Sequence, residues 1–433
     1  MSTLASTLAP TRAPMSETNS AVVRRIVPFL LLCYICSYLD RINVGFAKLQ
    51  MASDLRFSET AYGLGAGIFF IGYVLFEVPS NMMMVRTGPR FWIGRIMITW
   101  GVISGATMFI QGETSYYILR FALGVAEAGF IPAVIYYLGC WVPSAAKGRA
   151  TSLFMLGIPI AGILGGPLSG WILHGMDGVA GLAGWRWMFV LEAIPTVAAG
   201  IMAFKWLDDS PDQAKWLTPA QRIELKNELA RESQGKALHS TRDGLLSGKV
   251  WALAVLYISF NMGLYAVSFW LPTIIAQSGV TDPASVGMLT AIPYVAAFVT
   301  MMLVGRSSDR MRERRWHLAV PSFVGAIGLV TAVTYSDTPT IALVGMAVAA
   351  AGIITCIPQF YVLPSAILSG NAAAMGLAVA NSIGCIAGFA SPYMIGAIKD
   401  ATGSTSVGLI VVAGILVLGA AGALLIPKSL VNT

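Results

Sequence analysis

The sequence is poor in charged residues and in the side chains that build metal centres or catalytic sites. Asp, Glu, Lys and Arg make up 11% of the 433 residues, and the three histidines, His174, His239 and His317, form no ligand cluster. All five cysteines lie in or beside apolar stretches, including Cys33 and Cys36 with their Cys-x-x-Cys spacing, and there a thiol packs as a small apolar group. We therefore expect no metal, no cofactor and no enzymatic nucleophile–base pair.

Apolar residues, by contrast, exceed what one soluble core could bury. The chain is 56% hydrophobic, with a mean hydropathy of +0.72. A helix of about 20 apolar residues crosses the roughly 30 Å of a bilayer core, and twelve such stretches occur. They cover approximately residues 26–46, 61–83, 91–110, 115–138, 151–173, 187–207, 250–275, 285–305, 318–335, 340–363, 375–398 and 407–426. The sequence thus predicts an all-α protein with twelve transmembrane helices in a lipid bilayer.

The distribution of Lys and Arg between the short loops predicts the orientation. Thirteen of these residues fall at the two termini and in the loops on the same side, whereas Lys48, Arg56, Arg186 and Lys399 are the four on the opposite side. We therefore expect a protein of the cell inner membrane with both termini in the cytoplasm, its first span uncleaved. The same bias accounts for the net charge of +7, so no nucleic-acid partner is expected.

One long polar segment, residues 208–249, divides the spans six and six. We therefore predict a tail (1–25), a six-helix bundle (26–207), a linker (208–249), a second six-helix bundle (250–427) and a second tail (428–433). Within the linker, Thr218, Pro219 and Gln221 have the pattern of a capped helix start, which predicts an amphipathic helix to about Glu232.

The two halves also share features at a nearly constant offset. Arg86 and Arg310 are 224 positions apart, and Pro167 and Pro392 are 225 positions apart, each pair in equivalent settings. Such an offset indicates a duplicated unit, and duplicated transporters place their site near the membrane midplane between the repeats. The sequence predicts two pseudo-symmetric bundles with a site between them.

Several motifs resemble those of one family. They are Tyr38-Leu39-Asp40-Arg41-Ile42-Asn43, Glu77-Val78-Pro79-Ser80-Asn81, the segment from Arg120 to Phe130, Trp206-Leu207-Asp208-Asp209-Ser210-Pro211 and Ser308-Asp309-Arg310. Together they resemble the anion:cation symporter branch of the major facilitator superfamily. The resemblance implies proton-coupled import of an organic anion by alternating access. Similar members import tartrate, sugar acids, phthalate or hydroxyphenylacetate.

Two further motifs bear on gating and direction. The family's gating loop is degenerate around Arg86 and Arg90, where its Asp is missing, and is better kept around Asp309 and Arg310. The glycines and proline of residues 162–170 resemble a motif of drug–proton antiporters, which leaves a proton-driven exporter as an alternative. Small residues there also fit simple close packing of helices, the interpretation we favour.

Charged side chains at membrane depth are costly and are therefore candidates for function. Asp40 and Arg120 fall at the same depth on different spans, so we expect them to pair, either for transport or as a structural ion pair. Glu127 lies two turns beyond Arg120, near the midplane, with no cation one turn away. We predict that Asp40 and Glu127 carry the protons. Three others near the span ends, Glu77, Arg95 and Glu192, are expected in anchoring or gating ion pairs.

The guanidinium groups of Arg41 and Arg120 are the best candidates to bind a carboxylate, because their planar fork matches it bidentately. Further candidates for the substrate site, which also fit ordinary packing, are Tyr38, Tyr73, Tyr265, Trp270, Phe360 and Asn381. The apolar stretch 156–162, where sugar-acid members have a glutamine, favours an aromatic carboxylate such as phthalate and leaves tartrate open. We expect the protein to be a monomer. Outside the transporters, the alternative function is a membrane receptor that binds its ligand without transporting it.

Overall fold

The computed structural model describes residues 17–234, 248–367 and 371–431, and helices make up nearly all of this part. Its longer helices are α1 (Glu17–Asp54), α2 (Glu59–Thr87), α3 (Pro89–Ala106), α4 (Glu113–Glu127), α5 (Phe130–Trp141), α6 (Ser144–Met155), α7 (Gly157–Gly175), α8 (Gly184–Trp206), α9 (Pro219–Gln234), α11 (Gly248–Gln277), α12 (Pro283–Met311), α13 (Trp316–Thr334), α14 (Pro339–Ile367), α15 (Asn371–Thr402) and α16 (Ser406–Leu425), followed by the short α17 (Lys428–Val431). Ten spans, with α4–α5 and α6–α7 each counted once, are long and apolar enough to cross a membrane. Because α3 and α15 run beside them, the described part holds the twelve rods that the sequence predicts, and the all-α membrane fold is confirmed.

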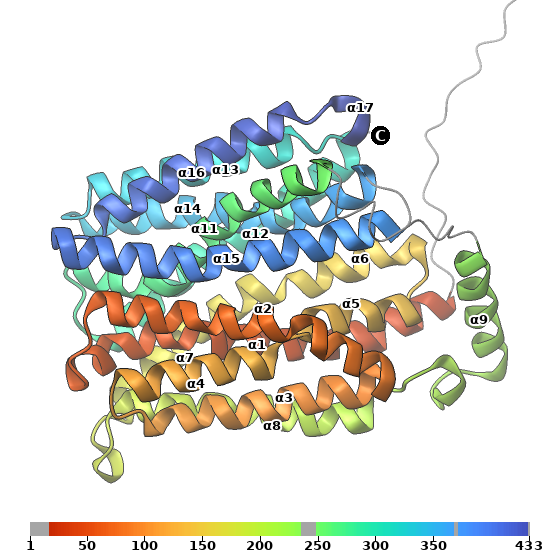
Figure 1. The fold of residues 1–433 in the computed structure, drawn as a ribbon, viewed down its shortest axis with the longest axis horizontal. Helices are drawn as coiled ribbons and strands as arrows, with labels where there is room; N and C mark the ends of the chain where they lie inside the picture. Colours follow the sequence, from red (N-terminus) through yellow and green to blue (C-terminus); the bar gives the residue numbers. More distant parts are fainter. Residues whose placement is uncertain (1–16, 235–247, 368–370, 432–433) are drawn as a thin grey trace, which may run out of the picture.

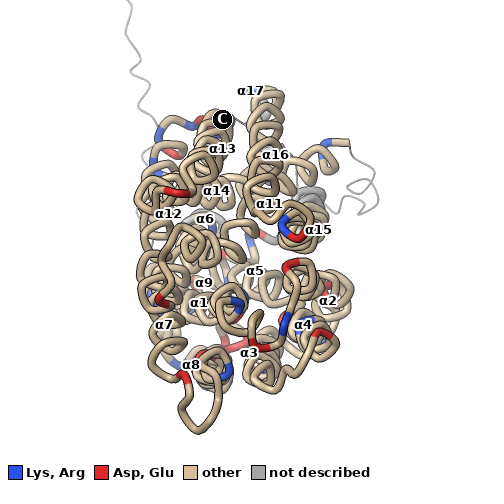
Figure 2. The backbone as a smooth tube through the Cα atoms, turned by 90° about the vertical axis from the view of Figure 1, so that its left-hand side faces the viewer, with Lys and Arg blue, Asp and Glu red and all other residues tan. Residues whose placement is uncertain are grey.

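The rods form two groups, α1–α8 and α11–α16, which lie one above the other in Figure 1. We call the end of the bundle where α1 begins and α17 lies the terminal end, and the opposite end the distal end. Viewed along the bundle, α2 faces α15 and α7 faces α12, and these two pairs supply most of the contact between the halves (Figure 2).

Small residues bring these helices close together. A Cβ atom on Gly63 of α2 would lie 2.4 Å from the backbone oxygen of Pro392 on α15. On the other side, a Cβ on Gly166 of α7 would lie 2.5 Å from the backbone oxygen of Gly287 on α12. The 162–170 motif therefore has a packing role here, as close approach requires glycine.

The span predicted over 115–138 is broken in the structure. Gly129 has φ +86, a left-handed conformation that favours glycine, and it separates α4 from α5. The Ser80 hydroxyl of α2 lies at this break and donates to the backbone oxygen of Ala128 at 2.6 Å. The break leaves Glu127 at the last residue of α4, deep in the bundle.

Helix α9 begins where the sequence predicts. The Thr218 hydroxyl accepts from the Gln221 amide at 3.3 Å, and the Gln221 side chain accepts from the Thr218 amide at 3.0 Å, a reciprocal capping box. Side chains of α9 bond to the start of α1, through Glu224 with Thr18 and Glu228 with Asn19. The linker helix is thereby held against the first half at the terminal end (Figure 1).

Candidate functional site

A narrow cavity lies between the halves near the middle of the bundle. The described residues on its wall include six tyrosines, two asparagines and one charged side chain, Arg41. Its volume is about 40 Å³, which accommodates a few water molecules but is far below the several hundred Å³ of ordinary small-molecule sites. The cavity is therefore contracted in this conformation.

Arg41 and Glu127 form a buried ion pair beside this cavity. Arg41 comes from α1 and Glu127 from the last turn of α4, and the guanidinium Nη2 donates to the Glu127 Oε1. The Ser37 hydroxyl, one turn before Arg41, donates to the same oxygen at 3.0 Å. The sequence places no cation one turn from Glu127 on its own helix, and the structure supplies the cation from another helix.

Arg120 lies behind the cavity wall and has no carboxylate partner among the described residues. Its guanidinium carbon lies 5.1 Å from the centre of the Phe69 ring, and that of Arg41 lies 5.4 Å from the same ring. The Arg120 Nε donates to the Gly65 backbone oxygen at 3.4 Å, and its Nη2 is buried without a hydrogen bond. Arg120 thus keeps unused capacity to bind an anion.

The expected pair between Asp40 and Arg120 is wrong. The Asp40 carboxylate accepts three hydrogen bonds within the first half, from Trp100 Nε1 at 2.7 Å, Ser104 Oγ at 3.0 Å and Thr196 Oγ1 at 2.7 Å. Successive side chains on a helix point about 100° apart, so Asp40 faces α3 and α8 while Arg41 faces α4. Depth along a span carries no information about the direction of a side chain around the helix.

Five of the eight residues predicted to bind substrate line the cavity: Arg41, Tyr38, Tyr73, Tyr265 and Asn381. The structure does not place the other three on the described wall. Phe360 stacks on Tyr257 behind the wall, at 4.3 Å between ring centres, and Trp270 lies towards the distal end with the Lys48 ammonium 3.8 Å from its ring centre. Arg120, as described above, lies behind Phe69.

The sequence interpretation missed other residues on the wall. Tyr257 and Asn261 precede Tyr265 on α11 at four-residue spacing, so one helix face carries all three. Tyr361 directly follows Phe360, and Tyr34 lies one turn before Tyr38. Helical spacing from the residues already chosen is a signal that could have found them.

Three charged residues do not form the ion pairs expected of them, within the described ranges. Glu77 of α2 is buried and accepts from Asn381 Nδ2 and Ser382 Oγ of α15, both at 2.9 Å. Glu192 accepts from Ser169 at 2.6 Å, and the Arg95 guanidinium lies over the Trp92 ring. Glu77 is the one that joins the two halves.

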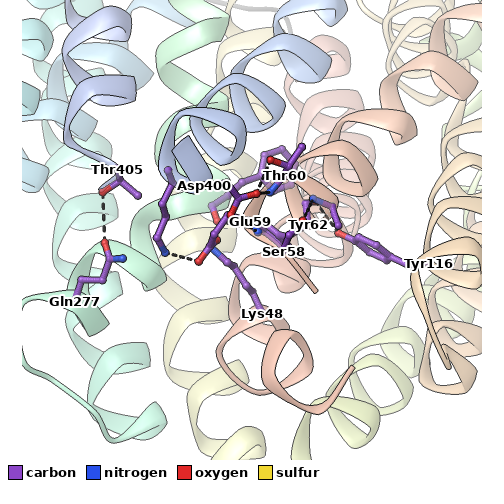
Figure 3. Close-up of polar contacts among 12 residues, drawn as sticks. Lys48, Ser58, Glu59, Thr60, Tyr62, Tyr116, Gln277, Asp400 and Thr405 are labelled. Atoms are coloured by element: carbon purple, nitrogen blue, oxygen red, sulfur yellow. Dashed lines mark hydrogen bonds and ion pairs between the residues drawn. The ribbon is translucent and has the colours of Figure 1, made fainter. Parts of the chain in front are cut away.

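A second polar cluster closes the distal end, and the sequence interpretation missed it. Glu59 at the start of α2 binds both Lys48 of α1 and Lys399 of α15. Figure 3 shows Glu59 with Lys48, Thr60 and Asp400. Asp400 accepts from the Thr60 backbone amide at 2.7 Å. The sequence alone puts Lys48 and Lys399 in loops, because the apolar stretches end before the helices do. In the structure, Lys48 lies seven residues after Arg41 and therefore shares its face of α1.

The predicted gating residues lie at the terminal end. The carboxylate missing near Arg90 comes from Asp209, whose Oδ1 accepts from the Arg90 backbone amide at 3.1 Å. Asp309 in the last turn of α12 pairs with Arg314 of the following loop at 2.8 Å. Arg86 in the last turn of α2 and Arg310 in the last turn of α12 are both exposed.

Comparisons with known proteins agree with the fold. Residues 30–392 match the model of the Major Facilitator Superfamily. A Pseudomonas putida protein named as a putative metabolite transport protein, NicT, is 49% identical over 415 residues, covering 95% of each chain. A putative tartrate transporter of Agrobacterium vitis is 46% identical over 407 residues, covering 94% of this chain and 90% of the relative.

A solved structure of a D-xylose–proton symporter covers 94% of this chain and is itself covered to 98%, with a TM-score of 0.74. At 18% identity this likeness shows the fold alone. The relatives carry the names of transporters and none of enzymes. The chain belongs to the Major Facilitator Superfamily, as a multi-pass transporter whose relatives fit the anion:cation symporter branch.

Proposed function

We propose that this chain imports a small organic anion together with protons, by alternating access. The observation that carries the proposal is the buried Arg41–Glu127 pair, with Arg41 on the wall of a cavity between the halves. A guanidinium binds carboxylates bidentately, so a substrate carboxylate competes with Glu127 for Arg41. The tartrate transporter named among the relatives supports an organic acid as substrate.

This competition couples the anion to a proton. When the substrate carboxylate takes Arg41, the Glu127 carboxylate loses its cation while it stays buried. A buried, uncompensated charge is costly, and protonation removes the charge. When the anion leaves, Arg41 returns to Glu127 and the proton is released.

Arg120 and Asp40 have supporting roles in this scheme. The free Nη2 of Arg120 lets this residue bind the substrate once the halves separate, beside the Phe69 ring that it shares with Arg41. Asp40 is buried among neutral donors and has no cation partner in the described part of the chain, so it can take up a second proton. Asp40 and Glu127 remain our proposed proton carriers.

The distribution of charge supports the orientation that we propose. Lys and Arg concentrate at the terminal end, which favours a cytoplasmic position for that end and an external position for the distal end. The Glu59 cluster closes the distal end in this contracted conformation. We propose that the chain works as a monomer whose two bundles, 26–207 and 250–427, rock about the cavity. The loops that carry Arg86, Arg90, Asp309 and Arg310 would control opening of the cytoplasmic end.

Two classes of organic acid fit the site. An aromatic carboxylate is the first choice, because Tyr34, Tyr38, Tyr73 and Tyr265 line the cavity together with Arg41. Tartrate is the second, favoured by the name of a close relative and by the hydroxyl groups of the same tyrosines.

Transport into proteoliposomes tests the proposal. Labelled phthalate and labelled tartrate are offered separately, with the outside medium more acidic than the lumen. Accumulation of either anion under this gradient, abolished by a protonophore, is the expected result. Loss of preloaded anion from the lumen under the same gradient indicates an antiporter, and binding without flux indicates a receptor.

A further inference from the structure

Helices α2 and α15 run antiparallel along the interface of the halves and carry one acid–amide contact beside the cavity. Glu77 of α2 accepts from Asn381 Nδ2 and from Ser382 Oγ, and Asn381 lines the cavity. The other end of the Asn381 amide, Oδ1, accepts from the Tyr361 hydroxyl at 3.2 Å. A single side chain therefore connects Glu77 of one half with the cavity wall of the other.

Among the described residues, no cation pairs with Glu77 to fix its charge. Among the described residues Glu77 makes no ion pair, and it is 5% exposed. The titratable side chains that interact with it are Tyr73 on α2 and Cys385 on α15, which are neutral at ordinary pH. Arg41 of α1 and Glu127 of α4, which interact with Tyr73, are paired with each other.

The charge of Glu77 dictates how Asn381 is oriented. An ionised carboxylate can only accept hydrogen bonds, so the Asn381 NH₂ group must face Glu77 and its carbonyl oxygen must face Tyr361. A protonated Glu77 can donate, so the amide can rotate by half a turn and direct its NH₂ group at the cavity. An anion in the cavity is repelled by the carbonyl oxygen and bound by the NH₂ group.

We propose that Glu77 and Asn381 form a polarity switch, in which protonation of Glu77 turns Asn381 from a hydrogen-bond acceptor into a donor for the substrate anion. Glu77 acts through Asn381 and is a positioning residue. The inference rests on the proposed anion transport and adds a proton site in contact with the second half, separate from Asp40 and Glu127. The proton on Glu77 and the anion at Asn381 then favour each other's binding.

The test measures the dissociation constant of phthalate or tartrate, whichever binds the purified full-length protein, at a series of pH values. Wild-type affinity should fall as pH rises. In Glu77→Gln the neutral side chain leaves the amide free to turn, so the slope of log Kd against pH should decrease by about one proton per anion. At the highest pH the variant should bind about tenfold more tightly than the wild type, as expected for one hydrogen bond to a charged group.

Two further variants separate a switch from a structural contact. Ser382→Ala removes the other hydrogen bond to Glu77 and should keep the wild-type slope. Asn381→Ala removes the group that responds, so it should lower the slope as Glu77→Gln does, and adding Glu77→Gln should change nothing more. If Glu77→Gln does not fold, Asn381→Ala alone tests the slope.

An unchanged slope in Glu77→Gln or in Asn381→Ala, with binding retained, overturns the switch and leaves the proposed transport intact. Failure of the wild type to bind either anion at any pH overturns the substrate class and the switch together.

Discussion

The Arg41 guanidinium of α1 binds the Glu127 carboxylate of α4, with Arg41 on the cavity wall and Glu127 behind it. Glu127 is the last residue of α4, and the chain turns at Gly129 into α5. This break and the Ser37 hydroxyl hold the carboxylate towards α1. A ligand that takes Arg41 therefore changes the charge balance of Glu127 without touching it.

The first prediction concerns Glu127→Gln. The neutral glutamine resembles the protonated carboxyl, so anion binding and the exchange of anion for anion should persist. Accumulation driven by a pH gradient should be lost, because the variant carries no proton at this position. Counterflow and gradient-driven uptake are measured in the same proteoliposomes. Loss of both activities means that Glu127 is needed for folding or binding.

The second prediction concerns Arg41. Arg41→Ala should weaken anion binding by at least about tenfold, and Arg41→Lys should restore little, because an ammonium is a point charge without the guanidinium fork. Arg95→Lys is the matched control, since Arg95 lies over Trp92 and away from the cavity. The anion affinity of Arg41→Ala, Arg41→Lys and Arg95→Lys is measured from the thermal stabilisation that the anion gives each variant. Equal affinities in the Arg41 variants and the control contradict the assignment.

The third prediction concerns Asp40, which accepts from three neutral donors. Asp40→Ala leaves these donors buried and unpaired, which should lower the free energy of unfolding by about 2–4 kcal/mol. Asp40→Asn keeps an acceptor and should cost less, yet lose gradient-driven uptake. Melting curves and uptake assays compare the two variants. Normal accumulation by Asp40→Asn makes Asp40 structural.

The fourth prediction concerns the distal cluster. Glu59→Gln removes the anion shared by Lys48 and Lys399, so the distal end should open more often. Cys385 lines the cavity and can report this opening in a variant whose other four cysteines are replaced. Its reaction with a membrane-impermeant thiol reagent, added outside, should be several-fold faster. Asp212→Asn, which breaks the exposed Lys226–Asp212 pair, should leave the rate unchanged.

The fifth prediction concerns Gly63, where an added Cβ would lie 2.4 Å from the backbone of α15. Gly63→Ala should force α2 and α15 apart and prevent full closure of the distal end. Exchange of anions should fall sharply while Cys385 becomes more reactive from outside. Gly414→Ala is the control, because nothing lies within 4 Å of the added Cβ there. Identical transport by the two variants refutes the closure argument.

The sequence by itself determined the membrane fold, because twelve apolar stretches can be satisfied only as spanning helices. It also identified Arg41, Tyr38 and Asn381 as candidates, since polar groups at membrane depth are rare and costly. The capped start of α9 at Thr218 followed from local chemistry alone.

Only the tertiary structure decided which charges meet. Asp40 and Arg41 are neighbours in sequence but point to different helices, so the partner of each depends on how α1, α3, α4 and α8 are rotated. Lys48 and Lys399 are separated by 351 positions, yet both bind Glu59. The contact of Glu77 with Asn381 likewise depends on the antiparallel register of α2 and α15. Helix rotation and register are set by packing over the whole interface, which no local pattern in the sequence encodes.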